Sequence, residues 1–405
     1  MSDEPKLPEQ TAIGWALFDA ADFKGAAQRF DMALHNDPTD VEALRGRARL
    51  HLMENDVGAA IILLEHALAV LQTGEEVAAP ADAEQRARRD LAWAYYRLNR
   101  FDLAAEQFAA LGERARANKL AALGGRTPYR RASNADSTAL PLVARDPVPF
   151  VLLTLGNRDH LFVVDTGTGE LTLDVRLLDE LGLPSFGVQP SRTAASDRHV
   201  AVHHTVIPRL RLGDIVLENV PAEAEDIQSR APQISGFIGF NLLAQFCITV
   251  DLPGGMLYLE PPRARRMPDG ATPVPFWLLD DHLLLVPGAL NGREHLFAVA
   301  SGFAGAALSA PPSTFTQSGV SLESGMPLQG VSGSGTHEVT LLRVEELRVG
   351  PLALHDVEAL AGLFSPSLEW RYGFRIGGLV GHEALRTVRW TLDLASRAFW
   401  FERED

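Results

Sequence analysis

Hydrophobic and polar positions follow two different patterns along the chain. Between residues 10 and 112, apolar residues recur every three or four positions among Ala, Leu, Glu, Gln and Arg, which is the pattern of amphipathic helices. From about residue 146, short runs of Val, Leu, Ile and Phe are broken by Gly, Pro, Asp and Asn, which is typical of strands and tight turns. We therefore expect a multidomain protein, with an all-α part followed by an all-β part.

The helical part contains a repeated signature. A small residue, a bulky residue and a further apolar residue recur at the same spacing in three copies, which are Ala26-Phe30-Ala33, Ala60-Leu64-Ala67 and Ala104-Phe108-Leu111. Small alanines let paired helices approach, and the bulky residue fills the groove between pairs. The signature resembles the tetratricopeptide repeat, which implies three helix pairs, about the minimum for a stable stack. Such stacks often bind a peptide on their concave face; the alternative is a stack that only packs on the rest of the chain.

The pattern also predicts domain boundaries. Residues 1–9 are expected to form a tail, and residues 10–112 the helical repeats. Residues 113–145 contain glycine and proline without periodicity and are predicted to be a linker. The β part is expected to divide into residues 146–262 and 263–405.

The β part is divided in this way because four blocks of sequence recur in the same order. The pairs of equivalent blocks are 147–150 with 273–276, 160–167 with 295–302, 210–220 with 347–357, and 236–260 with 378–402. Four matches in one order are hard to produce by chance. The sequence therefore predicts two homologous lobes.

The second of these blocks carries the candidate chemistry. An apolar run leads into Asp165, Thr166 and Gly167, and an apolar-apolar-Gly element follows about 70 residues later at 237–239. Together these motifs resemble the retropepsin/pepsin family of aspartic proteases, over roughly residues 146–405. The resemblance implies a pepsin-like double lobe made of tandem retropepsin-like domains. It also implies that Asp165 activates water, that Thr166 supports hydrogen bonds between lobes, and that Gly167 allows a tight loop.

The equivalent loop of the second lobe reads Ala300, Ser301 and Gly302. Serine and glycine fit the family pattern, but Ala300 stands where a second carboxylate is expected. Aspartic proteolysis uses two facing carboxylates, one ionised and one protonated, because two such close charges cannot both ionise. The second lobe is therefore degenerate, and its catalytic role is open.

By its resemblance the chain is expected to be an aspartic endopeptidase with Asp165 as the catalytic residue, and three interpretations follow from the missing carboxylate. Two chains could associate so that both Asp165 residues meet, giving an aspartic endopeptidase that is a homodimer. The two lobes could instead form an intramolecular pair that binds extended peptides or unfolded protein without cutting them, as a pseudoprotease. In the third interpretation the fold serves protein interaction, and the helical repeats recognise the partner.

Hairpins able to fold over a bound peptide are expected in both lobes. Residues 330–339 have the glycine density of a mobile flap, and residues 196–205 form the stiffer counterpart. His203 and His204 are adjacent, so on a strand they point to opposite faces, which is poor metal geometry; we expect exposed polar residues. His160 and His295 are equivalent in the duplication and are expected to be structural.

Composition and charge exclude several kinds of partner and binding site. The formal net charge of −15 argues against a nucleic-acid partner and against binding to anionic membranes. Cys247 is the single cysteine, so it forms no intramolecular disulfide; it is expected to be buried, and we expect neither a metal nor a cofactor. No apolar run is long enough to span a bilayer and the first residues do not resemble a signal peptide, so a cytoplasmic protein is expected.

Overall fold

The computed structural model describes residues 7–73, 79–193, 196–332 and 335–403. The chain divides into two compact units. The helical unit comprises the residues up to Gly124 together with two later segments, Leu278–Asp281 and Trp370–Arg375. The β unit comprises the rest of the chain. The division into an α part and a β part is therefore as predicted, with two short segments of the later chain assigned to the helical unit.

Seven helices occupy the described residues up to Gly124. They are α1 (Glu9–Asp19), α2 (Phe23–Asn36), α3 (Val41–Met53), α4 (Val57–Gln72), α5 (Ala83–Arg97), α6 (Phe101–Ala110) and α7 (Arg114–Ala121). Aspartate side chains cap the start of two of them: Asp22 accepts a hydrogen bond from Gly25 N at 2.9 Å, and Asp40 accepts one from Ala43 N at 2.9 Å. Both contacts satisfy amides that the first turn of a helix leaves without partners.

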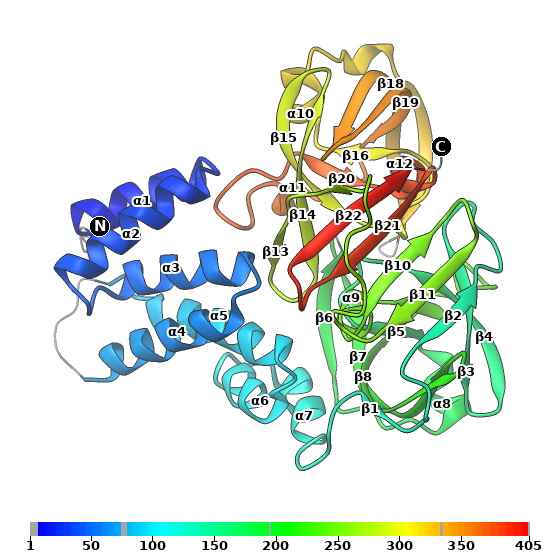
Figure 1. Cartoon of the computed structure of the whole chain (residues 1–405), viewed down its shortest axis with the longest axis horizontal. Coiled ribbons are helices and arrows are strands. Elements are labelled where there is room, and N and C mark those ends of the chain that lie inside the picture. The colour runs from blue at the N-terminus through cyan, green and yellow to red at the C-terminus, as the bar shows by residue number, and fades with distance from the viewer. Residues whose placement is uncertain (1–6, 74–78, 194–195, 333–334, 404–405) are drawn as a thin grey trace. The chain divides into compact units, whose positions relative to one another are not determined.

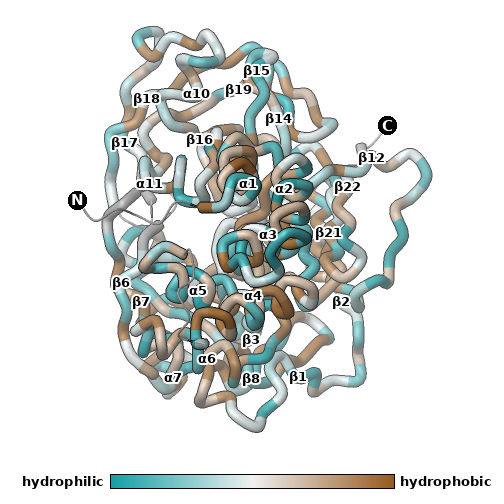
Figure 2. Tube along the Cα trace, turned by 90° about the vertical axis from the view of Figure 1, so that its left-hand side faces the viewer, coloured by the Kyte–Doolittle hydropathy of each residue, from teal (hydrophilic) through white to brown (hydrophobic). Residues whose placement is uncertain are grey.

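The repeated signature lies on the second helix of each successive pair. Its members on α2, α4 and α6 are buried, apart from Leu111, which follows α6 and is partly exposed. Phe30 shows how the packing works, because a Cβ added at Gly14 of α1 would lie 2.6 Å from its ring, and one at Gly46 of α3 would also collide with it. Figure 2 shows hydrophilic and hydrophobic positions along the same helices, as amphipathic packing requires. The helix pairs are confirmed, whereas their tetratricopeptide nature stays a prediction.

The predicted linker at 113–145 is wrong as a description of this segment. It contains α7 and two strands, β1 (Arg130–Arg131) and β2 (Thr138–Pro141). β1 pairs with β8 and β2 pairs with β11, so these residues belong to the β sheets. Strands of two and four residues are too short to show an alternating pattern, which is why the sequence did not reveal them. The predicted tail is also one residue too long, because α1 begins at Glu9.

The first eight-stranded sheet has the order β1-β8-β5-β9-β4-β3-β7-β6. β4 pairs with β9, and β5 with β8, in parallel, while the other neighbours are antiparallel. The further elements of this lobe are β3 (Phe150–Leu155), β4 (Arg158–Val164), β5 (Leu171–Asp174), α8 (Arg176–Leu181), β6 (Val188–Thr193), β7 (Ser196–Leu212), β8 (Ile215–Glu225), β9 (Gly236–Ile238) and α9 (Phe240–Leu243).

The second eight-stranded sheet has the order β13-β14-β15-β20-β16-β19-β18-β17. Its two parallel pairs, β15 with β20 and β16 with β19, occupy the places of β4 with β9 and β5 with β8. Its elements are β13 (Trp277–Leu279), β14 (Leu283–Leu290), β15 (Arg293–Val299), β16 (Leu308–Ala310), α10 (Pro312–Gln317), η1 (Leu322–Ser324), β17 (Met326–Ser332), β18 (Gly335–Val349), β19 (Leu352–Ala361), α11 (Pro366–Glu369), β20 (Gly378–Val380) and α12 (His382–Leu385). The duplicated sequence blocks thus form sheets with equivalent strand pairing.

A six-stranded sheet joins the two halves of the β unit, in the order β12-β22-β21-β10-β11-β2 (Figure 1). Its further strands are β10 (Cys247–Asp251), β11 (Met256–Glu260), β12 (Thr272–Pro273), β21 (Val388–Asp393) and β22 (Ala398–Arg403). The order is symmetric about the β21–β10 pair, where the buried hydroxyls of Thr249 and Thr391 lie 2.8 Å apart. Each half therefore contributes three strands, and the two eight-stranded sheets are parts of one unit.

Two predictions based on composition can also be compared with the structure. Cys247 is fully buried on β10, and burial raises the pKa of its thiol to about 11, which fits the predicted small hydrophobic residue. Within the described ranges, no helix combines the length and the apolar character needed to cross a membrane.

Candidate active site

Asp165 stands at the point where β4 ends and the chain turns. Its amide donates to the carbonyl of Ile238 at 3.1 Å, which ties the loop to the end of β9. Its Oδ1 accepts a hydrogen bond from Gly167 N at 2.8 Å, and its Oδ2 accepts one from Thr168 Oγ1 at 2.7 Å. Both carboxylate oxygens are thus held by donors from the same loop, which fixes the orientation of the side chain.

The loop of the second lobe has the same backbone arrangement without the carboxylate. The amide of Ala300 donates to the carbonyl of Val380 at 2.9 Å, as the amide of Asp165 does to Ile238. Gly302 N, the equivalent of Gly167 N in the second loop, donates a hydrogen bond to Asp165 Oδ1 at 3.0 Å. Ala300 is buried. The predicted site therefore contains one carboxylate that is hydrogen-bonded by both loops.

Thr166 and Ser301 join the two loops through reciprocal hydrogen bonds. Thr166 N donates to Ser301 Oγ at 3.1 Å, and Ser301 N donates to Thr166 Oγ1 at 3.1 Å. Each hydroxyl then donates onward to the opposite strand, Thr166 Oγ1 to Val299 O at 3.2 Å and Ser301 Oγ to Val164 O at 2.8 Å. Both side chains are buried, so all four contacts are shielded from water.

The glycines of the motifs are required by close approach of the backbone. A Cβ at Gly302 would lie 2.5 Å from Asp165 Cγ, and a Cβ at Gly167 would lie 2.6 Å from Ala300 Cβ. Gly239 passes so close behind the first loop that a Cβ would collide with the carbonyl of Glu170. Only glycine lets these segments come together without displacing the loops.

An apolar cavity of about 380 Å³ adjoins the loop of the second lobe at Gly302. Its walls are mostly aliphatic and aromatic side chains of the first lobe, among them Val148, Leu161, Val163, Ile234 and Phe237. A cavity of this size accommodates one large apolar side chain or a small organic group. The cavity therefore adjoins the loop whose Gly302 N donates to Asp165.

Each lobe also has the expected hairpin. β6 pairs with β7, and β17 pairs with β18, in equivalent positions of the two sheets. The hairpin tips, residues 194–195 and 333–334, lie outside the described residues, and so does the centre of the predicted glycine-rich flap. The hairpins have the edge position from which a β-strand can pair with an extended peptide.

The histidine predictions are partly corrected. His204 is buried, not exposed, and its Nδ1 lies 3.5 Å from Glu223 Oε1 on the neighbouring strand. This burial was not predictable from local sequence, because it depends on the pairing of β7 with β8. His295 Nε2 lies 3.0 Å from Ser318 Oγ, a structural contact. Among the described residues, no group of three or more His, Cys, Asp or Glu side chains is placed to hold a metal.

Three residues of the site were not singled out from the sequence. Thr168, which follows the Asp-Thr-Gly motif directly, holds Asp165 Oδ2. His382, directly after the second lobe's apolar-apolar-Gly element, is buried with its Nε2 3.5 Å from Asp146 Oδ1. The position of Thr168 beside the motif was a usable signal. The pairing of Asp146 with His382, more than 230 residues apart in sequence, was not visible before the lobes were placed together.

Comparisons with known proteins support the resemblance that the sequence predicts for the first lobe. Residues 151–242, which run from β3 to α9, match a family model described as aspartyl protease. A solved structure described as a retropepsin-like aspartic protease from Rickettsia conorii is 18% identical, covers 32% of this chain and 94% of that chain, and has a TM-score of 0.24. No curated protein matches the chain. The predicted resemblance to aspartic proteases is confirmed for residues 151–242, and the Asp165 loop lies inside these matched residues.

Proposed function

We propose that the β unit binds an extended peptide segment in a one-carboxylate, aspartic protease-like site, and that it does not hydrolyse the segment by the paired-carboxylate mechanism. The observation that carries the proposal is the pairing of the two loops. The methyl group of Ala300 takes the place of the second carboxylate, and Gly302 N, which would serve that carboxylate, donates to Asp165 instead. The pepsin-like double lobe is thereby kept as a binding fold.

The chemistry of the site supports binding over turnover. In a pair of carboxylates, the protonated partner donates a hydrogen bond to the scissile carbonyl while the ionised one activates water. Ala300 can do neither. Such pairs act as a unit, so loss of one member lowers the rate by several orders of magnitude. Asp165 remains able to accept a hydrogen bond from a main-chain amide of a bound segment.

The surroundings of Asp165 favour a peptide as the ligand. The apolar cavity beside Gly302 suits one large hydrophobic side chain. The β6–β7 and β17–β18 hairpins offer main-chain hydrogen bonds to an extended strand. Together these features indicate an extended protein segment with a hydrophobic residue next to the position of Asp165.

Pairing of Asp165 residues from two chains is the alternative that gives an endopeptidase. The reciprocal contacts of Thr166 with Ser301 argue against it, since they already engage the face of the Asp165 loop that a second chain would have to meet. For a homodimeric protease to form, the two lobes of each chain would first have to separate. We therefore rank it below the binding function.

The test compares the full-length chain with Asp165→Ala, Ala300→Asp and Ala300→Asn variants. Fluorescence anisotropy with a hydrophobic, unstructured peptide measures binding, and a quenched peptide substrate measures cleavage between about pH 3 and 7. We expect the natural chain to bind without cleaving and Asp165→Ala to bind more weakly. Ala300→Asp is expected to gain cleavage that Ala300→Asn, of equal size, does not gain.

Cleavage by the natural chain that is lost in Asp165→Ala would overturn the proposal. A solution mass measured under the same conditions would then distinguish a homodimeric protease from a monomer. Absence of binding in the natural chain and in all variants would exclude a peptide ligand.

A further inference from the structure

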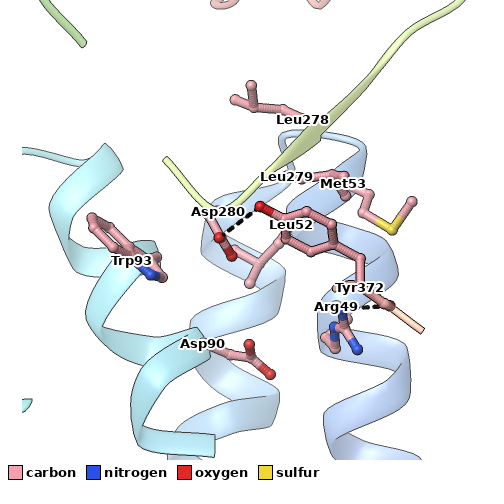
Figure 3. Close-up of a pocket in the computed structure, with 9 residues that line it drawn as sticks. All are labelled: Arg49, Leu52, Met53, Asp90, Trp93, Leu278, Leu279, Asp280 and Tyr372. Carbon is pink, nitrogen blue, oxygen red and sulfur yellow. Dashed lines mark hydrogen bonds between the residues drawn. The ribbon is translucent and has the colours of Figure 1, made fainter. Parts of the chain in front are cut away.

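The helical unit contains a second candidate site, separate from the Asp165 loop. It is formed by the helices and the two later segments, Leu278–Asp281 and Trp370–Arg375, that belong to the same compact unit. Figure 3 shows the centre of this site, where Tyr372 and Asp280 lie between α3 and α5. The cavity that remains between these residues is about 30 Å³, room for about one water molecule.

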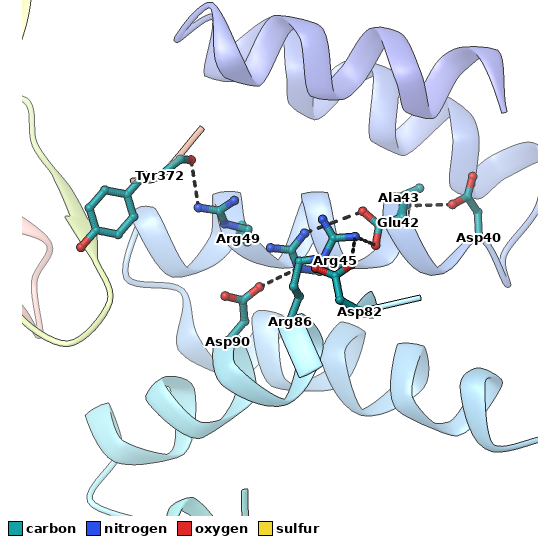
Figure 4. Close-up of polar contacts among 9 residues, drawn as sticks. All are labelled: Asp40, Glu42, Ala43, Arg45, Arg49, Asp82, Arg86, Asp90 and Tyr372. Carbon is teal, nitrogen blue, oxygen red and sulfur yellow. Dashed lines mark hydrogen bonds and ion pairs between the residues drawn. The ribbon is translucent and has the colours of Figure 1, made fainter. Parts of the chain in front are cut away.

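Two arginines of the helices hold the segments by their main chains. Arg97 Nε donates to Asp280 O at 2.5 Å, and Arg97 Nη2 donates to Leu278 O at 3.1 Å. Arg49 Nη2 donates to Tyr372 O at 3.1 Å (Figure 4). Guanidinium groups that meet backbone carbonyls recognise the path of a chain and not its side chains.

The side chains of the second segment provide the selectivity. Phe374 is fully buried, with ring centroids 5.5 Å from Phe18 and 5.0 Å from Phe23, both in edge-on geometry. The hydroxyl of Tyr372 donates to Asp280 Oδ2 at 2.9 Å. Each of the two aromatic side chains therefore has its own partner. Phe374 packs against the rings of Phe18 and Phe23, and Tyr372 donates to the carboxylate of Asp280.

The residue between them has to be glycine. Gly373 has a φ of +95°, a backbone conformation that residues with a side chain rarely adopt, and a Cβ there would lie 2.7 Å from Asp19 Oδ1. The glycine turns the chain so that both aromatic side chains reach the helices. The recognised pattern is therefore aromatic–glycine–aromatic.

Neighbouring charges affect the pKa of Arg49, the residue that donates to the carbonyl of Tyr372. Figure 4 shows acidic and basic side chains on and next to α3 and α5, among which Arg45 Nε lies 3.0 Å from Asp90 Oδ2. Asp90 and Asp280 favour the charged form of Arg49 and oppose the lowering of its pKa by burial. The positive charge that meets the Tyr372 carbonyl is thus balanced within the helical unit.

We propose that the helical unit is a binding site for an aromatic–glycine–aromatic peptide segment, and that this chain occupies the site with its own Tyr372, Gly373 and Phe374. The observations that carry the proposal are the arginine contacts to backbone carbonyls, the packing of Phe374 against Phe18 and Phe23, and the requirement for glycine. The site does not depend on the proposed function of the β unit. A tethered segment has a high local concentration, so the natural chain excludes a free peptide of the same sequence.

The experiment removes the two aromatic side chains that occupy the site in the full-length chain and adds the same segment as a separate peptide. The variant is Tyr372→Ala with Phe374→Ala, and the matched control is Trp370→Ala, which removes an exposed aromatic side chain of the same segment. The probe is a fluorescein-labelled peptide with the sequence of residues 367–377, and its control carries alanine in place of Gly373. Fluorescence anisotropy measures the affinity of each chain for each peptide.

We expect the vacated variant to bind the probe at least about tenfold more tightly than the natural chain or Trp370→Ala does. It should also prefer the probe over the alanine peptide by at least about tenfold, although both peptides carry the same aromatic residues. Equal affinity of all three chains for the probe would overturn the proposal, as would equal affinity of the vacated variant for the two peptides.

A second measurement applies if circular dichroism shows that the double variant does not fold. The exposed Arg371 is a trypsin site within the segment. The contacts of Tyr372 and Phe374 should prevent the backbone around Arg371 from entering the active site of trypsin. We expect the natural chain to be cut after Arg371 at least about tenfold more slowly than Phe374→Leu, which keeps an apolar but not an aromatic residue. Equal cleavage rates would contradict recognition of the segment.

Discussion

At the scale of single residues, the alanine at position 300 leaves the candidate site with an asymmetric set of hydrogen bonds. Gly167 N donates to the carboxylate of its own loop, but Gly302 N has no carboxylate in its own loop and donates across to Asp165. Oδ1 of Asp165 therefore accepts hydrogen bonds from two main-chain amides. A carboxylate introduced at position 300 would compete for Gly302 N, which is why Ala300→Asp tests the proposed function directly.

The side chain of Ser301 is predicted to stabilise the pairing of the two loops. Ser301→Ala would leave the buried Thr166 N and Val164 O without their partners, at a cost of about 1–3 kcal/mol in the free energy of unfolding. Urea denaturation measures the change. Ser301→Thr keeps the hydroxyl and should restore most of the stability, and Ser324→Ala, on the exposed η1 helix, should change it little. A loss in Ser324→Ala as large as that in Ser301→Ala would contradict the assignment.

At the scale of secondary-structure elements, the helices and the strands differed in how far they could be predicted. Helical periodicity extends over ten or more residues, so α1–α6 were visible as a group. β1 and β2 have too few residues for any period, and they form strands only because β8 and β11 offer free edges. Burial of His204 likewise depends on the pairing of β7 with β8. These are features of tertiary structure that local sequence does not encode.

Two glycines of the helices are predicted to respond in opposite ways to the same substitution. Alanine favours a helix by up to about 1 kcal/mol relative to glycine, and at Gly58 of α4 an added methyl group meets no atom within 4 Å. Gly58→Ala should therefore stabilise the chain by about 0.5–1 kcal/mol.

Gly46→Ala should instead destabilise the chain, by about 1–3 kcal/mol, because the methyl group would collide with the buried ring of Phe30. Thermal or urea unfolding followed by the helical circular dichroism signal compares the two variants. Stabilisation by both substitutions would mean that α1 and α3 do not close on Phe30.

At the scale of the whole β unit, the two lobes are equivalent in strand pairing but not in the residues that meet between them. Phe240 in the first lobe corresponds to His382 in the second, and both are buried directly after a glycine that packs against the candidate-site loop of its lobe. His382 alone faces an acidic residue, Asp146, which comes from the segment before β3. The β unit thus has this titratable contact on one side only.

His382 is predicted to make the β unit sensitive to acid. Burial lowers its pKa below the usual value of 6.5, and the neighbouring Asp146 only partly opposes this. As the pH falls below 6.5, the unfolded chain binds a proton that the folded chain resists, so the free energy of unfolding decreases until the lowered pKa is passed.

His382→Phe, which introduces the residue of the equivalent position, should therefore lose less stability between about pH 7.5 and 5 than the natural chain. The reverse substitution, Phe240→His, should lose more. Urea denaturation at each pH provides the measurement. Identical pH dependence of the natural chain and His382→Phe would contradict a buried, neutral histidine.

The sequence by itself determined the α and β parts, the duplication of the β part and the aspartic protease-like Asp165 loop. It also determined the absence of a carboxylate at position 300, because these are properties of local pattern and of residue identity. Tertiary structure alone decided that the two loops meet, with Gly302 N on Asp165 and Thr166 paired with Ser301. It also decided that Tyr372 and Phe374 belong to the helical unit. These contacts join residues more than 130 positions apart, and their geometry depends on how sheets and helices pack and not on any sequence period.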